Sequence, residues 1–364
     1  MRKIICTVTN DLNFDQRMIR ICSSLTDAGY DVTLVGWVIG EKTPLQKKKY
    51  KQKRFHLFFN KGKLGYFEYN FRLFWWLLFK KVDILNAIDV DSLLANYMVK
   101  VIRRKPLVFD AHEYYVELPE LVARPRTRMI WKALADYCIP RIQYNYTVCQ
   151  SLADIFKDIY RRDFEVIRNV PFRQSGNNFV TKNDNKKIIL YQGWLNLGRG
   201  LPEMIHAMEF IDAEFWVAGD GDITNELITL VNELKLENKV KFLGKLDPSD
   251  LKSITEQAYI GINLLENLGL NNYYSLANKT FDYIQAGIPA LHMDFPEYRV
   301  INDEFNIGIL LSDLNKETIT DSINLLINDE TLYNHLVENT KKAAIQLNWE
   351  HESKKLIAIY ENVK

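Results

Sequence analysis

Short buried-strand patterns alternate with helical patterns twice along this chain of 364 residues. The first alternation opens with an apolar run over 3–8, a helical pattern over 16–28 that ends at Gly29, and another apolar run over 31–36. Strand, helix, terminating glycine and strand form a βαβ unit, whose crossover requires parallel strands. Such units predict an α/β fold, with helices on both faces of a parallel sheet.

The same alternation continues and then starts again after a polar stretch without periodicity at 173–185 (RQSGNNFVTKNDN), which we interpret as a linker. The first series adds strands at 84–87, 107–110, 144–149 and 164–167, and helices at 93–103 and 151–160. The second has strands at 188–192, 214–218, 240–243, 260–264 and 289–292, and helices at 202–208, 225–234 and 279–286. We therefore predict two Rossmann-like, doubly wound domains, 1–172 and 173–349, facing each other across a cleft.

The net charge of +1 conceals opposite charges in the two halves. Residues 1–172 hold 29 Lys and Arg against 18 Asp and Glu, whereas the remainder holds 18 against 28. A basic first half indicates that this half faces something anionic.

The four cysteines form no close pair in the sequence, and none lies in the second half: Cys6, Cys22, Cys138 and Cys149. We expect reduced thiols in a cytoplasmic protein rather than disulfides or a zinc site. Met1 leads directly into the first strand pattern, so no export signal is expected, and no apolar run reaches the ~18 residues of a membrane span.

Ligands of open parallel sheets bind beyond the carboxyl ends of the strands, so the loops there are the places to look for chemistry. Ser275–Asn278 leads into the helix at 279–286, and its amides are expected to form an anion site. Lys279 adds a mobile positive charge, and Asp282 is able to accept hydrogen bonds from a ribose diol. The alternative is an ordinary capped helix with a solvated Lys and Asp.

The segment 278–289, NKTFDYIQAGIP, resembles the donor-site motif NK-x-F-E-Y-M-x-A-G-x-P of the retaining, GT-B-fold glycosyltransferases of family 4, also called glycosyl transferases group 1. Many members carry two glutamates eight positions apart, and the second binds the donor ribose. Asp282 takes the second position here and Tyr274 the first, so one acid is shortened and the other is absent.

Three further segments of the second domain match this family in order. YQGWLNLGRG at 191–200 resembles the loop Gly-Arg-Leu-x-x-x-Lys-Gly, whose basic residues hold the donor diphosphate; Trp194 replaces the first and Arg199 the second. Arginine binds phosphate bidentately, although a surface arginine after a turn is the alternative. FWVAGDGD and FLGKL match the segments beside the donor and its base. The resemblance implies donor binding by Gly193, Arg199, Gly219, Asp220, Gly221, Lys245, Leu246, Ser275, Leu276, Ala277, Asn278, Lys279 and Asp282.

The first domain also matches the family. TNDLNFDQR at 9–17 resembles the loop between acceptor and donor, LNAID at 85–89 matches a segment more usually H-A-H-D with Asn86 in place of a histidine, and FDAHE at 109–113 matches D-A-H-E. The family's matching histidine lies close to the transferred sugar. The resemblance implies an acceptor site of Asn10, Asp15, Arg17, Asp89, His112 and Glu113, and a last helix, 350–364, that packs back on the first domain.

The reaction that the resemblance implies moves a sugar from a UDP- or GDP-linked donor to a hydroxyl of a glycan or lipid-linked acceptor, with retention, in cell-surface polysaccharide synthesis. Arg199 and Lys279 would neutralise the departing diphosphate, while Asp15 and His112 would orient acceptor and sugar. No metal and no cofactor besides the donor is expected, and the pair Asp89 and Asp91 is interpreted as helix caps rather than metal ligands.

Two other functions remain open. A sugar-nucleotide 2-epimerase has the same two-domain fold but needs acid and base carboxylates that no motif supplies. A non-catalytic partner of another transferase fits the departures at Tyr274, Trp194 and Asn86.

The stretch 42–81 has twelve basic residues against one acid, Glu68, with eight aromatic residues from Tyr66 to Phe79 between them. Basic residues attract anionic lipid and exposed aromatic rings anchor at the interface, so we predict a peripheral membrane surface here, on the inner face of the membrane. The alternative makes 71–79 a buried core helix. Nucleic acid is not expected as a partner, because no other feature supports it.

Overall fold

The computed structural model describes residues 1–38, 44–59, 62–173 and 187–364. Their contacts divide the chain into two compact units. The first comprises Met1–Asn169 with His351–Lys364, and the second comprises Val170–Glu350. Of the predicted linker, only Arg173 is among the described residues. Lys42 and Lys61 of the basic stretch lie outside the described residues.

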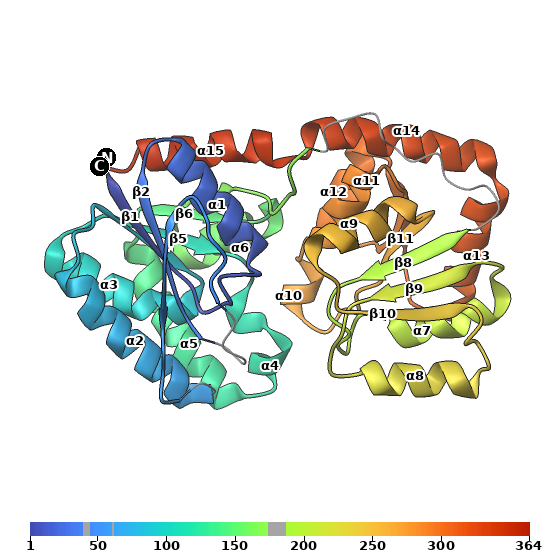
Figure 1. Cartoon of the computed structure of the whole chain (residues 1–364), viewed down its shortest axis with the longest axis horizontal. Coiled ribbons are helices and arrows are strands. Elements are labelled where there is room, and N and C mark those ends of the chain that lie inside the picture. The colour runs from blue at the N-terminus through green and yellow to red at the C-terminus, as the bar shows by residue number, and fades with distance from the viewer. Residues whose placement is uncertain (39–43, 60–61, 174–186) are drawn as a thin grey trace. The chain divides into compact units, whose positions relative to one another are not determined.

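The first unit is built on a parallel sheet of seven strands in the order β3-β2-β1-β4-β5-β6-β7 (Figure 1). The strands are β1 (Lys3–Thr7), β2 (Asp31–Trp37), β3 (Lys51–Phe55), β4 (Ile84–Ile88), β5 (Leu107–Ala111), β6 (Tyr144–Thr147) and β7 (Glu165–Val166). The helices are α1 (Gln16–Asp27), α2 (Gly62–Phe79), α3 (Leu93–Arg103), α4 (Pro119–Val122), α5 (Pro125–Cys138) and α6 (Gln150–Tyr160). α15 (Trp349–Glu361) joins this unit through Tyr360, whose ring meets Tyr30 and whose hydroxyl lies 3.5 Å from that of Tyr146.

The second unit has a parallel sheet of six strands in the order β10-β9-β8-β11-β12-β13. The strands are β8 (Ile188–Gln192), β9 (Glu214–Ala218), β10 (Val240–Gly244), β11 (Ile260–Asn263), β12 (Ala290–Met293) and β13 (Gly308–Leu311). The helices are α7 (Leu201–Ala207), α8 (Thr224–Glu233), α9 (Pro248–Gln257), α10 (Leu270–Tyr273), α11 (Asn278–Ala286), α12 (Pro296–Phe305), α13 (Lys316–Asn328) and α14 (Glu330–Gln346).

The predicted α/β fold with two Rossmann-like sheets is confirmed. The predicted strands at 188–192 and 214–218 and the helix at 93–103 have the bounds of β8, β9 and α3. The strand β3 was not predicted, because its sequence KQKRF has the composition of a solvated loop. Its position explains that composition, since an edge strand tolerates lysine and is even protected by it.

Each sheet reverses its strand order at one place, and this is where open α/β sheets bind ligands. In the first sheet the reversal falls between β1 and β4, and in the second between β8 and β11. The loops that follow these four strands begin near Thr9, Asp89, Gly193 and Leu264. Three of the four carry residues that the sequence predicts to bind substrate.

Candidate active site

The loops after β8 and β9 pack backbone against backbone in the second unit. The amide of Gly193 donates to the carbonyl of Ala218 (3.0 Å), and that of Leu195 donates to the carbonyl of Asp220 (3.1 Å). A Cβ on Gly219 would lie 1.8 Å from the Gly193 carbonyl oxygen, and one on Gly221 would lie 2.4 Å from that of Leu195. Gly219 and Gly221, both predicted donor residues, therefore allow the loops after β8 and β9 to pack in direct contact. This contact fixes the backbone of the candidate donor site.

Replacing Gly219 with alanine is expected to unfold the second unit or to destabilise it by at least ~3 kcal/mol, because the clash is with backbone that cannot move aside. Gly244→Ala is the matched control. Gly244 also has a positive φ (+67°), but an added Cβ would meet no atom within 4 Å. The control should lower the free energy of unfolding by only ~1–2 kcal/mol, which is the cost of placing alanine in the left-handed conformation. Urea unfolding of both variants makes the comparison, and equal costs would contradict the close approach.

Lys279 packs against these loops and is buried, so the predicted mobile charge was wrong, and so is the solvated lysine of the alternative. Its Nζ lies 3.7 Å from the centroid of the Tyr191 ring and 3.5 Å from the place that a Cβ on Gly193 would occupy. Burial lowers the pKa of Lys279 well below its ordinary value, Arg199 lowers it further, and Asp282 opposes both. The lysine is thus a buried amine whose protonated form an arriving anion would stabilise.

Arg199 follows in the same loop, between Gly198 and Gly200, and is partly exposed. Burial raises the pKa values of Tyr191 and Tyr298 and the Arg199 charge opposes this, while the same charge adds to the burial that lowers the pKa of Lys279, so all three lie within its field. Across residues 1–38, 44–59, 62–173 and 187–364, the Arg199 guanidinium has no hydrogen-bond or ion-pair partner. A partly exposed arginine and a buried lysine within its field form a candidate site for a multiply charged anion.

Two consecutive hydrogen bonds that the sequence did not predict hold the Asp282 carboxylate. Gln192 Nε2 donates to Asp282 Oδ2 (2.8 Å), and Thr255 Oγ1 donates to Gln192 Oε1 (2.7 Å). Because an ionised carboxylate only accepts hydrogen bonds, Asp282 fixes which end of the Gln192 amide faces it. The position of Gln192 at the carboxyl end of β8 was the available signal.

The segment before α11 was predicted to offer free amides, and this is wrong for two of them. The Ala277 amide donates to the Tyr298 hydroxyl (3.0 Å), and the Ser275 amide donates to the Asn272 carbonyl (3.2 Å). Tyr298 itself stacks on His292, which lies 3.1 Å from Thr280. The start of α11 is therefore a rigid support for Lys279.

The remaining predicted donor residues lie on neighbouring loops. Asp220 Oδ1 accepts hydrogen bonds from the Gly221 amide and the Thr224 hydroxyl, which secures the turn into α8. Lys245 and Leu246 follow β10, with Lys245 exposed, and Trp194 in the replaced basic position is 65% exposed. Of the predicted donor residues, the structure packs Gly193 and Lys279 together, with Arg199 and Asp282 close enough to act on the lysine electrostatically.

The first unit contains a buried charge network at the carboxyl end of β5. Arg17 donates to Asp110 through Nη2 (2.9 Å) and to the Ile167 carbonyl through Nη1 (2.8 Å), and both charged side chains are buried. The predicted acceptor contact of Arg17 therefore needs correction, because its guanidinium is enclosed by protein. Its role in the structure is to hold Asp110.

Asp110 in turn holds His112, whose Nε2 lies 2.9 Å from Asp110 Oδ2. On the other side, the His112 amide donates to Asp89 Oδ1 (2.8 Å), and Nδ1 lies 3.7 Å from Asp89 Oδ2. Burial disfavours the charged ring, but Asp110 and Asp89 outweigh burial and raise the pKa of His112 to about 9. His112 is thus an imidazolium at neutral pH and acts as a donor and a positive charge, not as a base.

The raised pKa of His112 predicts a pH dependence of stability. Since its folded value of about 9 exceeds the ordinary 6.5, the stabilisation is complete below pH 6.5 and is lost as the pH rises through 9. The loss is at most about 3 kcal/mol. Urea unfolding at pH 6.5 and 9.5 should show it in the wild type, while His112→Gln should show a flatter profile. Identical profiles would contradict the charged histidine.

Asp15 and Asp89 have structural contacts of their own. Asp15 caps α1, accepting from the Met18 amide (3.0 Å), and Asn10 Nδ2 donates to its other oxygen (2.9 Å). Asp89 stands at the N-cap position of the turn Val90–Ser92, as predicted, but its side chain makes no cap bond and its φ is 54°. Asp91 lies within that turn, so the cap interpretation is wrong for Asp91.

Asp91 is a candidate that the sequence reasoning missed. Its Oδ2 accepts from Thr9 Oγ1 (2.5 Å), burial raises its pKa to about 7, and its Oδ1 has no partner among the described residues. It follows β4 at the reversal of strand order, and that position was the signal in the sequence.

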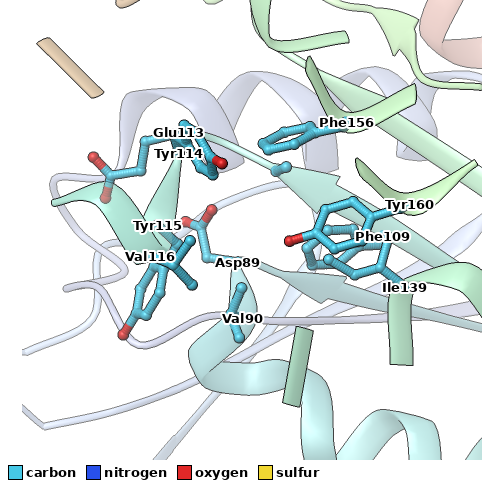
Figure 2. A pocket seen from close by; sticks show the side chains of 11 residues that line it. Asp89, Val90, Phe109, Glu113, Tyr114, Tyr115, Val116, Ile139, Phe156 and Tyr160 are labelled. Carbon is cyan, nitrogen blue, oxygen red and sulfur yellow. The ribbon is translucent and has the colours of Figure 1, made fainter. Parts of the chain in front are cut away.

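A pocket opens beside this network, within the first unit. Asp89 and Glu113 present carboxylates on one side, while Phe109, Phe156 and Tyr160 lie together on the other (Figure 2). The free volume of this pocket is about 10 Å³, which is room for about one water molecule, so it is a small hollow beside the two carboxyl side chains. The pocket contains two of the predicted acceptor residues.

The predicted membrane stretch contains β3 and α2. Tyr69 in this helix is buried, with its hydroxyl on the Val8 carbonyl (2.8 Å), whereas Phe71 and Phe79 are exposed. The stretch is thus neither wholly core nor wholly surface. No helix in the described part of the chain is both long and apolar enough to cross a bilayer.

No group of three or more His, Cys, Asp or Glu side chains among the described residues is arranged to hold a metal ion. Independence from metal stays a prediction, tested below with a chelator.

Two parallel Rossmann-like sheets, each with one reversal of strand order, define the class: this is the fold of the GT-B glycosyltransferases. Residues 173–343 match the family model of the glycosyl transferases group 1. This match covers most of the second unit, which holds Arg199 and Lys279, and it supports a glycosyltransferase of that group. Membership of family 4 stays a prediction.

Among individual proteins, the uncharacterized glycosyltransferase MJ1607 of Methanocaldococcus jannaschii is 26% identical over 200 residues, which are 53% of this chain and 48% of that protein. The match thus spans about half the length of that relative. Sucrose-phosphate synthase from Thermosynechococcus elongatus has a TM-score of 0.81 at 14% identity, covering 99% of this chain and 98% of that one. Anabaena Alr3699/HepE in complex with UDP-glucose has a TM-score of 0.79 at 16% identity, covering 99% and 100%. At these identities the two structures show a shared fold.

Proposed function

We propose that this protein transfers a sugar from a nucleoside-diphosphate sugar to a hydroxyl of a glycan or lipid-linked acceptor, with retention of configuration. The observation that carries the proposal is the pairing of Lys279, buried beneath Gly193, with Arg199 in the loop after β8. Both lie at the strand reversal of the unit that matches the glycosyltransferase family model. The UDP-glucose bound to HepE supports a nucleotide-sugar donor.

The two cations act on the leaving group. The bond between the anomeric carbon and the phosphate oxygen breaks, and its electron pair stays on the diphosphate, which Arg199 and Lys279 neutralise. Stabilising the charge that develops in the transition state is the largest contribution that such a site makes. Asp282, oriented by Gln192, accepts hydrogen bonds from the donor ribose.

The first unit supplies the binding site for the acceptor. Asp89 and Glu113, which border the small hollow after β4 and β5, accept hydrogen bonds from sugar hydroxyls, and Asp15 helps to orient the acceptor. His112, held as a cation by Asp110 and Asp89, orients the transferred sugar but cannot take the acceptor's proton. The acceptor oxygen bonds to the anomeric carbon, and its proton passes to the departing phosphate.

The test is release of nucleoside diphosphate from a panel of UDP- and GDP-sugars, measured with and without a chelator. The expected result is slow release from one donor family that a chelator does not reduce. An NMR spectrum of the first sugar released reports its configuration, and an inverted anomer would overturn retention. No release from any donor, with nucleotide still bound, would favour a non-catalytic partner, and conversion of the UDP-sugar without release would favour the epimerase.

A further inference from the structure

The outward face of α2 is apolar where a surface helix normally carries charge. Gly65, Tyr69, Leu73 and Leu77 form its buried face. On the opposite face a row at helical spacing is exposed: Leu64, Phe67, Phe71, Trp75 and Phe79, with Phe79 78% and Phe67 70% exposed. An apolar row on the outward face of a surface helix marks a contact surface, so this row calls for a partner.

The four rings of the row are packed against one another along the helix. Phe67 stacks on Phe71 (6.3 Å between centroids), Phe71 meets Trp75 edge-on (6.4 Å), and Trp75 stacks on Phe79 (6.3 Å). Phe58, 87% exposed, extends the row before the helix, since its amide is held by Glu68 and its ring lies under the Arg72 guanidinium (5.0 Å). The exposed surface is therefore rigid and continuous.

The apolar face continues onto α3, which lies beside α2 (Figure 1). The Ala95 amide donates to Asn70 Oδ1 near the start of α3, and Arg103 donates to the Leu77 carbonyl near its end, so the two helices run parallel. α3 exposes Leu94, Met98, Val101 and Ile102. We call the exposed rows of both helices the α2–α3 face.

The charges around this face are almost all positive. Lys63, Lys80, Lys81 and Arg104 are exposed at the helix ends, and α3 itself contains no acid. The one acid of α2, Glu68, is occupied by the Phe58 and Phe59 amides and by Arg72. Phosphate headgroups complement a basic rim, and aromatic side chains suit the layer just beneath them.

We propose that the α2–α3 face docks on an anionic lipid bilayer, with the rings of α2 inserted at the interface and the lysines on the headgroups. The proposal goes beyond sugar transfer, because the face shares no residue with the donor site or the acceptor pocket. Of the stretch 42–81 that the sequence predicts to contact the membrane, the proposed surface keeps only the exposed side of α2. It adds the exposed residues of α3 and excludes the buried Tyr69.

The test is flotation of the full chain with vesicles of phosphatidylcholine alone or mixed with phosphatidylglycerol. The wild type should bind the anionic vesicles at least tenfold better than the neutral ones. Phe71→Ser/Trp75→Ser and Lys80→Glu/Lys81→Glu should each lower anionic binding at least tenfold. The matched controls, Leu325→Ser/Ile345→Ser and Lys342→Glu/Lys354→Glu, change equally exposed residues elsewhere and should bind as the wild type does.

Two results would overturn the proposal. One is that vesicle binding does not depend on the face: either the wild type binds no vesicles, or the control variants lose as much vesicle binding as the face variants. The other is a wild type that is dimeric without lipid and becomes monomeric in Phe71→Ser/Trp75→Ser, since a second copy would then cover the face. Nucleoside diphosphate release without vesicles should be unchanged in both face variants, so failure of docking is separable from failure of the proposed activity.

Discussion

Replacing Arg199 with alanine is expected to lower kcat/KM for the donor by about 10²–10³-fold, the usual cost of removing one transition-state charge donor. The guanidinium has no hydrogen-bond or ion-pair partner among the described residues, so the folded state should lose little, and the melting temperature should stay within about 2 °C. Nucleoside diphosphate release and thermal unfolding of the same preparation give both values.

The matched control is Arg299→Ala. Arg299 is exposed and paired with Asp294 in the same unit, on helix α12, and it is not among the residues predicted to bind the donor. Its removal should leave turnover unchanged. Arg199→Lys should recover part of the activity, because lysine restores the charge but not bidentate binding of phosphate. Full turnover in Arg199→Ala would show that the arginine does not act on the leaving group.

Replacing Lys279 with methionine is expected to weaken nucleoside diphosphate binding at least ~30-fold while leaving the folded protein as stable as the wild type or more so. The reason is that burial disfavours the protonated form of Lys279, which makes no ion pair among the described residues, so the ammonium gains most of its stabilisation only when an anion arrives. A purely structural lysine would give the opposite result, with stability lost and affinity kept. Calorimetric titration and urea unfolding separate the two.

The pH dependence of binding follows from the same residue. Burial and Arg199 lower the pKa of Lys279 in the free protein, and a bound diphosphate should raise it again, so binding takes up a proton. Affinity should therefore fall as the pH rises above the lowered value. Titrations in HEPES and Tris should give different heats of binding. The difference should equal the number of protons taken up multiplied by the difference between the ionisation enthalpies of the two buffers. Lys279→Met should abolish that difference, and equal heats in the wild type would contradict the depressed pKa.

Much of the fold could be predicted from local patterns. Apolar runs such as 188–192 and 214–218 are buried strands because parallel strands are covered on both faces, so their composition alone identifies them. The same rule missed β3, since an edge strand need not be apolar. The helix α5 was also missed, because few of its residues are buried and its apolar stripe is weak.

The candidate site was predicted less completely, for a reason that lies in the tertiary contacts. Motif spacing indicated Arg199 and Lys279, but the burial of Lys279 depends on Tyr191 and Gly193, which are distant in sequence. The burial of Arg17 likewise depends on Asp110 and Ile167, which come from other elements. Local sequence carries the identity of a side chain, whereas its solvent exposure and its pKa are set by neighbours from elsewhere in the chain.

The most direct test of the central claim is a thermal-shift titration of the wild type and Arg199→Ala with UDP, GDP and ADP, each with and without a chelator. A ligand that binds only the folded protein raises its melting temperature by mass action. A nucleotide-sugar donor site predicts a chelator-resistant rise with one nucleotide in the wild type that is largely lost in Arg199→Ala. No rise with any nucleotide, or the same rise in both proteins, would contradict the assignment of a donor site to this pair of cations.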